Sequence, residues 1–140
     1  MIISKKFTLE CAHQLPHSTP EECETYGKCS RLHGHSYKVH LKVRGDTCAD
    51  GWVLNFSTVS DWAKENIENK CDHYFLNDVY PDMITTAENL ATLWGKMLQE
   101  WLNSTYPDRK LYVQEVEVWE TEKCRAIATQ EDITPPSTNV

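Results

Sequence analysis

Hydrophobic and polar residues alternate along two segments in the first third of the chain. In residues 7–13 every second side chain is apolar up to His13, and in residues 33–44 one face carries His33, His35 and a row of apolar residues. A period of two is typical of a strand with one buried face. Both segments are therefore predicted strands, the first of which ends at His13, and the two histidines of the second share a face.

Two later segments have the three- and four-residue spacing of helices. Ser57 is the predicted N-cap of a helix that runs to about Asn69. A second helix is expected to begin at a capping box formed by Thr85 and Glu88. Its apolar positions form one broad stripe, typical of a helix that packs on a sheet: Leu90, Leu93, Trp94, Met97, Leu98 and Trp101.

The remaining pattern completes an α+β fold. Residues 52–56 indicate a short strand, and residues 111–120 and 123–129 indicate two strands joined by a tight turn. Residues 14–32 and 70–84 are predicted loops. The main elements follow the order strand, strand, helix, helix, strand, strand. This order favours a four-stranded antiparallel sheet with two helices on one face.

The chain length fits a single domain. There are 140 residues, 40% of them hydrophobic, with no internal repeat and no linker-like segment. We expect one domain over residues 1–130 and a flexible C-terminal tail over residues 131–140, which contains the stretch ITPPSTNV. A lone four-stranded sheet has bare edges, which favours association with further copies of the chain.

Charge and hydropathy argue against several kinds of partner. The chain has 14 basic and 21 acidic residues and a formal net charge of -7, and no basic cluster is long enough to follow a phosphate backbone, so no nucleic acid is expected. Apolar runs are far shorter than the roughly 20 residues that cross a bilayer, and the start MIISKKFTLE lacks a signal-peptide core. We therefore expect a cytoplasmic protein without a membrane partner, whose six cysteines are reduced thiols.

The histidine pattern indicates a metal site. The spacing His-Gly-His at residues 33–35 puts two imidazoles on one face of a strand, and His13, at the end of another strand, is the natural third ligand. Catalytic zinc commonly takes three protein ligands and leaves a fourth position for water or substrate. The alternative is three ordinary polar side chains. His17 is a reserve ligand, whereas His40 falls on the opposite face of its strand.

Cys29 is a candidate reactive group near this metal. It lies four residues before His33, so its sulfur can approach the metal region without joining the ligand set. A nearby dication would favour the thiolate, which is the reactive form of cysteine. Two alternatives stay open: a buried structural cysteine, or a fourth ligand that closes the zinc site.

Two further polar pairs could take part in chemistry. Asp72 is followed by His73, so the carboxylate could set the tautomer of the imidazole, although such a dipeptide alone is weak evidence. Glu120, at a strand end and followed by Thr121, could accept two hydrogen bonds from a planar edge such as that of a pterin or guanine. The alternative for Glu120 is an exposed carboxylate at the end of a strand.

Five short motifs occur in a fixed order along the chain: ECAHQLPH, CSRLHGHSY, CDHYFLND, TTAENLA and WET. In this order and at these intervals the sequence resembles the 6-pyruvoyltetrahydropterin synthase / 6-carboxytetrahydropterin synthase family. The resemblance spans residues 7–128, which is most of the chain. It implies the following residue roles: zinc ligands His13, His33 and His35, a catalytic Cys29, a proton-transfer dyad of Asp72 and His73, and pterin binding by Glu120 with Thr121.

The resemblance also implies the tunnelling fold and its assembly. In that fold subunits join their sheets into a trimeric barrel, two trimers stack as a homo-hexamer, and active sites lie between subunits. The short spacing from Cys29 to His33 is similar to that of bacterial carboxy enzymes, whereas animal pyruvoyl enzymes have two more residues there. The branch implied is the zinc-dependent 6-carboxy-5,6,7,8-tetrahydropterin synthase of queuosine biosynthesis.

The implied substrate is 7,8-dihydroneopterin triphosphate, with release of acetaldehyde and triphosphate. Two alternatives stay open: a pyruvoyl-forming synthase, which releases triphosphate without acetaldehyde, and a non-catalytic zinc-stabilised binding module. The chain departs from the family pattern at Asn55, Cys71 and Thr85, where the family often has Asp, Leu and Pro. None of these departures removes a reacting group.

Overall fold

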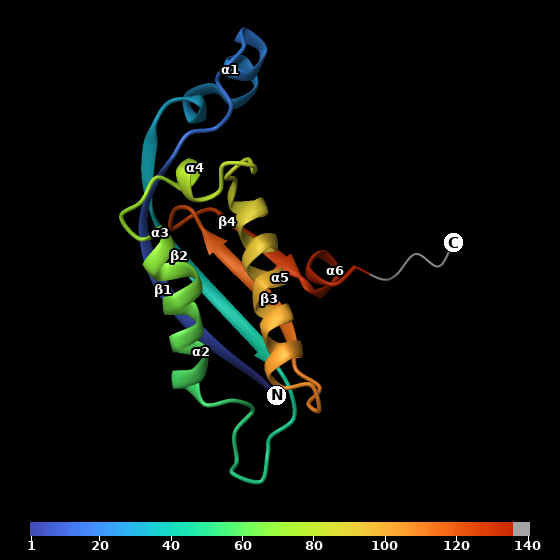
Figure 1. Cartoon of the computed structure of the whole chain (residues 1–140). Helices are drawn as coiled ribbons and strands as arrows, with labels where there is room; N and C mark the ends of the chain where they lie inside the picture. The colour runs from blue at the N-terminus through green and yellow to red at the C-terminus, as the bar shows by residue number, and fades with distance from the viewer. Residues whose placement is uncertain (136–140) are drawn as a thin grey trace, which may run out of the picture.

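A computed structural model describes residues 1–135 of the chain. Four strands form one antiparallel sheet in the order β1-β2-β3-β4. The predicted four-stranded sheet is therefore confirmed, and Figure 1 shows helices α2 and α5 crossing one of its faces. The strands have these bounds: β1 (Ile2–His13), β2 (His33–Arg44), β3 (Tyr112–Trp119) and β4 (Arg125–Thr129).

Alternation along the strands divides the sheet into two faces. The face under the helices is apolar and buried, with Leu9, Tyr37, Val39 and Leu41 each 0% exposed. The first two strands pair along their whole length, and Leu9 lies opposite Tyr37 in this register. Burial of one face fixes the register, because a slip of one residue would turn the apolar set toward water.

Helix α2 (Phe56–Ala63) begins two residues earlier than predicted. Its N-cap is Asn55, whose Oδ1 accepts a hydrogen bond from the backbone N–H of Ser57, 2.9 Å away. The predicted cap at Ser57 is therefore wrong. The expected strand over residues 52–56 is wrong as well, because this segment leads directly into the capped helix. A π-helical turn, η2 (Lys64–Glu68), and α3 (Asn69–Cys71) continue α2.

Helix α5 (Ala87–Thr105) carries the predicted apolar stripe, and its buried members pack on the sheet. Its N-cap is Thr86, whose hydroxyl accepts from the backbone N–H of Asn89, and not Thr85 as the sequence predicts. Thr85 is instead buried at 1% exposure. Among residues 1–135, no helix is both long and apolar enough to cross a bilayer.

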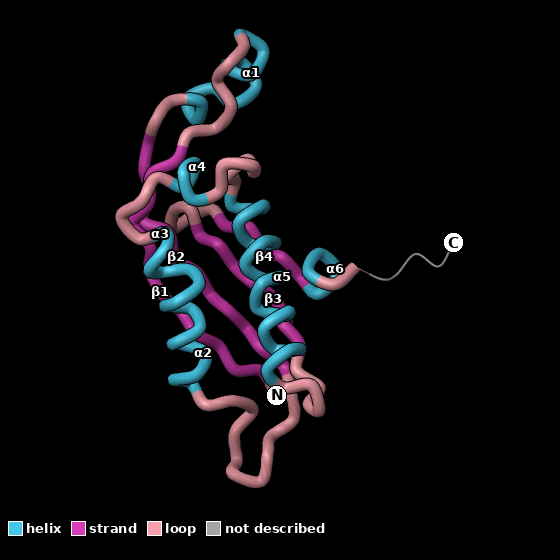
Figure 2. Tube along the Cα trace, viewed as in Figure 1, coloured by secondary structure: helices cyan, strands magenta, loops and turns pink. Residues whose placement is uncertain are grey.

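Both predicted loops contain short helices, which Figure 2 shows as cyan turns beyond one end of the sheet. The segment 14–32 holds α1 (Pro20–Tyr26) and a 3-10 turn, η1 (Gly27–Ser30). A capping box between Thr19 and Glu22 starts α1, with Pro20 in its first turn, so the helix has a local signal that the loop prediction missed. The segment 70–84 holds α4 (Leu76–Val79).

A last short helix, α6 (Gln130–Ile133), corrects the expected start of the tail. Ile133 is 5% exposed and packs against α5 at Gly95, where a Cβ would lie only 2.6 Å from the Ile133 side chain. Residues 131–133 therefore belong to the folded domain, because Ile133 contributes to its core. The part of the expected tail at residues 136–140 lies outside the described residues.

Replacing Ile133 with Ala should destabilise the protein by about 2 kcal/mol, since the change removes buried methyl and methylene groups. Urea unfolding followed by circular dichroism measures this loss. The matched control is Ile127→Ala, because Ile127 is 39% exposed and should cost less than about 0.5 kcal/mol. Equal stability of the two variants would show that α6 contributes nothing to the core.

The face of the sheet away from α2 and α5 holds a buried carboxylate. Glu117 is 3% exposed and accepts hydrogen bonds from Arg125 Nη1 at 2.7 Å and Trp119 Nε1 at 3.1 Å. Lys42 Nζ and His40 Nδ1 lie 3.3 Å and 3.0 Å from its oxygens. Burial alone would raise the pKa of Glu117, but hydrogen bonds from Trp119 and Lys42, with the charges of Lys42 and Arg125, hold this pKa below its ordinary value.

Acidification should weaken the fold through Glu117. The pKa of Glu117 is lower in the folded chain than its ordinary value of 4.5. The carboxylate therefore stabilises the folded chain at pH values above 4.5, and this stabilisation is lost as the pH falls through the lowered pKa. We expect Glu117→Gln to be less stable than wild type near pH 7, with the difference narrowing below about pH 4.5. Urea unfolding at a series of pH values measures the narrowing. Glu115→Gln, which removes the other carboxylate bonded to Lys42, is the control, and an identical profile would contradict the assignment to Glu117.

Candidate metal centre

Three histidines converge at the end of the sheet nearest α4. His13 is the last residue of β1 and lies directly opposite His33, the first residue of β2, while His35 follows two positions later on the same face. One ligand nitrogen from each ring lies within 4.8 Å of the others. Gly34 lies between the two β2 histidines, where a Cβ would approach the Cys11 carbonyl oxygen to 3.2 Å. The structure thus brings the three predicted ligands together.

Backbone carbonyls set the tautomer of two of these rings. His13 Nδ1 lies 2.8 Å from the carbonyl oxygen of Thr85, and His33 Nδ1 lies 2.6 Å from that of Arg31. A carbonyl oxygen can only accept a hydrogen bond, so each Nδ1 must carry the hydrogen and donate it. In the neutral rings, the lone pair is therefore on Nε2 and points into the cluster.

The cluster has the electronic features of a cation site. Nε2 of His13 and Nε2 of His33 are 3.0 Å apart, so two lone pairs oppose each other unless a cation lies beside them. His35 Nε2 is buried and has no hydrogen-bond partner among the described residues. Glu120 Oε1 lies 3.1 Å from this nitrogen, but the two groups are not oriented to form a hydrogen bond. Three bare imidazole nitrogens fit a zinc ion with an open fourth position.

Burial favours the neutral, metal-binding form of His13 and His35. It lowers the pKa of His13, which is 1% exposed, and outweighs the opposite effect of the hydrogen bond to Thr85. Burial also lowers the pKa of His35, and the carboxylate of Glu120 only partly offsets it. Protons therefore compete weakly for the ligand atoms near neutral pH.

Cys29 lies in η1 beside the cluster but not within it. Its carbonyl oxygen accepts a hydrogen bond from the backbone N–H of Leu15 at 3.0 Å, two residues beyond His13. The side chain is partly exposed, and its sulfur makes no hydrogen bond within residues 1–135. The group of convergent ligand atoms comprises the three histidines without Cys29, which argues against a closed four-ligand site. Its catalytic role stays a prediction.

The predicted dyad lies along the outer edge of β1. Asp72 Oδ2 accepts from His73 Nδ1 at 2.9 Å, and Asp72 Oδ1 accepts from the backbone N–H of Glu10 at 2.9 Å. His73 has a positive φ of 65°, and its backbone N–H donates to the Glu10 carbonyl. The hydrogen bond from Glu10, followed by that from His73, lowers the pKa of Asp72. No hydrogen bond or ion pair joins the side chains of this dyad to the histidine cluster within residues 1–135.

Glu120 and Thr121 follow β3 and have different local roles. Glu120 lies against His35, as described above, and its side chain is 29% exposed. The Thr121 hydroxyl accepts from the backbone N–H groups of Lys123 and Cys124, both at 3.2 Å, and so closes the turn before β4. Binding of a pterin edge by these two residues stays a prediction.

The other histidines lie outside the cluster. The reserve ligand His17 is paired with the Leu15 carbonyl, with its Nδ1 3.3 Å away. His40 lies on the opposite face of the sheet beside Glu117, as its strand parity predicts.

Sequence reasoning missed three participants in the site. The carbonyls of Arg31 and Thr85 carry no side-chain signal, and Thr85 was expected to be a helix cap. Tyr37 shares the face of His35, and the two ring centroids are 5.4 Å apart. Its buried hydroxyl has no hydrogen-bond partner within the described residues. Strand parity indicates the position of Tyr37 but not this unsatisfied group.

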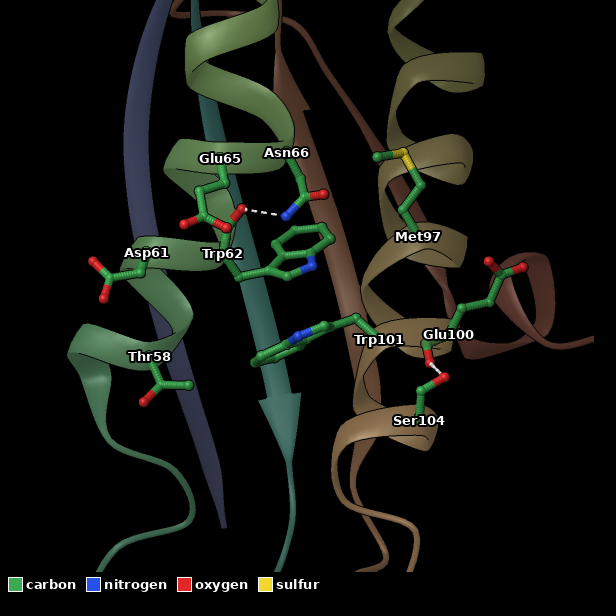
Figure 3. A pocket seen from close by; sticks show the side chains of 9 residues that line it. All are labelled: Thr58, Asp61, Trp62, Glu65, Asn66, Met97, Glu100, Trp101 and Ser104. Atoms are coloured by element: carbon green, nitrogen blue, oxygen red, sulfur yellow. Dashed lines mark hydrogen bonds between the residues drawn. The ribbon is translucent and has the colours of Figure 1, made fainter.

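A large groove lies away from the histidines. It has a volume of about 710 Å³ and runs between α2 and α5. Figure 3 shows Trp62 and Trp101 facing each other across it, with ring centroids 6.0 Å apart. None of the predicted site residues lines this groove, so its size alone does not identify the functional site.

The fold and the histidine cluster together define an α+β domain with a candidate metal centre at one end of its sheet. The chain belongs to the 6-pyruvoyl tetrahydropterin synthase family, whose profile matches residues 2–131. This confirms the resemblance inferred from the five motifs. The family consists of pterin synthases, so an enzyme is the supported class of protein.

Individual relatives cover most of the chain. A 6-carboxy-5,6,7,8-tetrahydropterin synthase of Synechocystis sp. is 36% identical over 104 residues, covering 71% of this chain and 75% of the relative. A 6-pyruvoyl tetrahydrobiopterin synthase of Poecilia reticulata is 35% identical over 118 residues, covering 79% and 76%. The solved 6-pyruvoyl tetrahydropterin synthase of Caenorhabditis elegans superposes with a TM-score of 0.75 over 92% of this chain and 94% of that chain, at 24% identity. This last likeness shows the fold alone.

Zinc binding should require His33 and should not require His17. Purified wild type is expected to retain zinc through dialysis, and His33→Ala should lose it, because two nitrogens cannot replace a three-nitrogen donor set. Elemental analysis after dialysis measures the zinc content of each variant. His17→Ala is the matched control and should keep its zinc. Unchanged zinc content in His33→Ala would refute the ligand assignment.

Proposed function

We propose that the protein is a zinc-dependent 6-carboxy-5,6,7,8-tetrahydropterin synthase of queuosine biosynthesis. It converts 7,8-dihydroneopterin triphosphate and one water molecule to 6-carboxytetrahydropterin, acetaldehyde and triphosphate. The observation that carries this proposal is the convergence of three bare imidazole nitrogens beside Glu120. The identity to the Synechocystis carboxy enzyme and the short spacing from Cys29 to His33 support this branch of the family.

Each residue of the proposed site has a separate role in the reaction. His13, His33 and His35 would hold the zinc, which when bound supplies a Lewis acid next to the oxygens of the substrate side chain. Glu120 binds the pterin by accepting hydrogen bonds from its N–H edge. The Cys29 thiolate removes and returns protons at the carbons of the side chain.

His73 is the complementary acid and base. The ionised Asp72 accepts the Nδ1 hydrogen of His73, so in the neutral ring Nε2 has a free lone pair that can exchange a proton. The lowered pKa of Asp72 keeps this carboxylate charged near neutral pH.

We also propose a homo-hexamer, a dimer of trimers built by joining sheet edges into barrels. The outer strands β1 and β4 leave two edges for such joining. Asp72 and His73 lie at the β1 edge, and within residues 1–135 no hydrogen bond joins their side chains to the histidine cluster. We propose that they complete the site of a neighbouring subunit. The six free cysteines fit the reducing cytosol that we propose as the location.

The pyruvoyl-forming reaction is the second candidate, because the Poecilia reticulata relative carries that name at 35% identity. Both reactions use the same substrate and differ in their products. A non-catalytic zinc-stabilised module would produce neither.

Incubation of the zinc-loaded protein with 7,8-dihydroneopterin triphosphate, followed by mass spectrometry, should reveal 6-carboxytetrahydropterin and acetaldehyde. A pyruvoyl product would replace the proposed reaction with the second candidate, and unchanged substrate would remove both. Cys29→Ala should lose at least about 100-fold in kcat while keeping its zinc, because the group that moves protons is absent. Cys23→Ala, which removes an exposed thiol in α1, is the matched control and should retain activity.

A further inference from the structure

The end of β1 pairs with the strand that carries His33 and His35, and it is hydrogen-bonded to the segment of Asp72 and His73. Along its outer edge, the chain segment after α3 runs parallel to it. Glu10 is bonded to Asp72 and His73, and the backbone N–H of Ala12 donates to the Tyr74 carbonyl at 3.2 Å. This ladder of hydrogen bonds fixes the dyad relative to the strand that carries His13.

The side chain of Asn77 adds the last two hydrogen bonds along this edge. Its Oδ1 accepts from the backbone N–H of Gln14 at 3.0 Å, and its Nδ2 donates to the Gln14 carbonyl at 2.7 Å. A side-chain amide here replaces the peptide group that a neighbouring strand would present. Asn77 therefore holds the residue after His13 in an extended strand geometry just past the end of β1.

Gln14 and Leu15 reach from this clamped position to the turn that holds Cys29. Gln14 Nε2 donates to the Ser30 carbonyl at 2.9 Å, and the Leu15 backbone N–H donates to the Cys29 carbonyl at 3.0 Å. Two adjacent carbonyls of η1 are thus bonded to two adjacent residues of the extended segment. The position of Cys29 relative to His13 follows from these four hydrogen bonds together.

We propose that Gln14 and Asn77 are positioning residues that hold the Cys29 turn in place relative to His13. This inference rests on the proposed function, since it assigns the pair a purpose in that reaction. Neither side chain belongs to the convergent ligand set of His13, His33 and His35. Their effect comes from holding reacting groups in place, and a displacement of about 1 Å at a reacting atom can cost on the order of 100-fold in rate.

Two substitutions disrupt this positioning without removing side-chain volume. Gln14→Met is nearly isosteric and deletes only the donor to Ser30. Asn77→Asp keeps the acceptor for the Gln14 N–H but replaces the Nδ2 donor with an oxygen that opposes the Gln14 carbonyl. Each should lower kcat by about 10-fold or more, with KM and zinc content unchanged, because the zinc ligands and Glu120 are intact. Steady-state kinetics and elemental analysis measure these quantities.

A rescue variant and a matched control separate positioning from a general structural effect. Gln14→Lys restores an N–H donor of similar reach and should recover most of the lost kcat. Asn66→Ala deletes a single side-chain hydrogen bond of 2.9 Å to the Trp62 carbonyl, away from the histidines, and should leave kcat unchanged. Unchanged kcat in Gln14→Met, zinc loss parallel to activity loss, or failure of the Lys variant to rescue would each overturn the proposal.

A second measurement distinguishes failure of this inference from failure of the proposed function. Cys29 alkylation by iodoacetamide, followed by peptide mass mapping, requires no turnover. A turn released from Gln14 should react several-fold faster in Gln14→Met and Asn77→Asp, and at the wild-type rate in Gln14→Lys. If wild type does not convert the pterin triphosphate, the proposed function fails, and equal alkylation rates in all variants would overturn the positioning role independently.

Discussion

The pairing of β1 with β2 is the constraint on which the rest of the structure depends. This register places His13 opposite His33 and puts His35 within reach of both. A shift of one residue would move the apolar residues of one strand to the open face and separate the imidazoles. The hydrophobic core therefore specifies the arrangement of the histidine cluster, because burial of residues such as Leu9 and Tyr37 holds the register.

The same strand geometry separates two electrostatic environments. On β2, His35 and His40 are five residues apart and thus on opposite faces. His35 lies beside the rings of His13 and His33 and the carboxylate of Glu120, whereas His40 lies within a network of charged groups around Glu117. The sheet itself therefore separates the candidate ligand His35 from the charged network around Glu117, because successive side chains of a strand point to opposite faces.

Strand parity explains how much of the site could be predicted. The faces of His33 and His35 follow from their spacing, and the location of His13 at a strand end follows from where alternation stops. Adjacent threonines were harder to assign: Thr85 and Thr86 both suit a helix cap, and only tertiary contact with His13 decides that Thr86 is the cap. The short helix α6 has a local signal that the tail prediction missed, a capping box between Thr129 and Asp132. The packing of Ile133 against Gly95 is a long-range contact that local propensity does not encode.

The two hydrogen bonds that orient the imidazoles come from the main chain, and this affects how the sequence can change. Every amino acid supplies a carbonyl oxygen, so substitution at positions 31 and 85 preserves the acceptors for His13 and His33 as long as the backbone path is kept. Proline at position 85 would also be compatible with this, because proline lacks the N–H but retains the carbonyl. The side chains at positions 31 and 85 can therefore change while the carbonyl groups that orient the rings are kept. A comparison of side chains would not reveal these two groups.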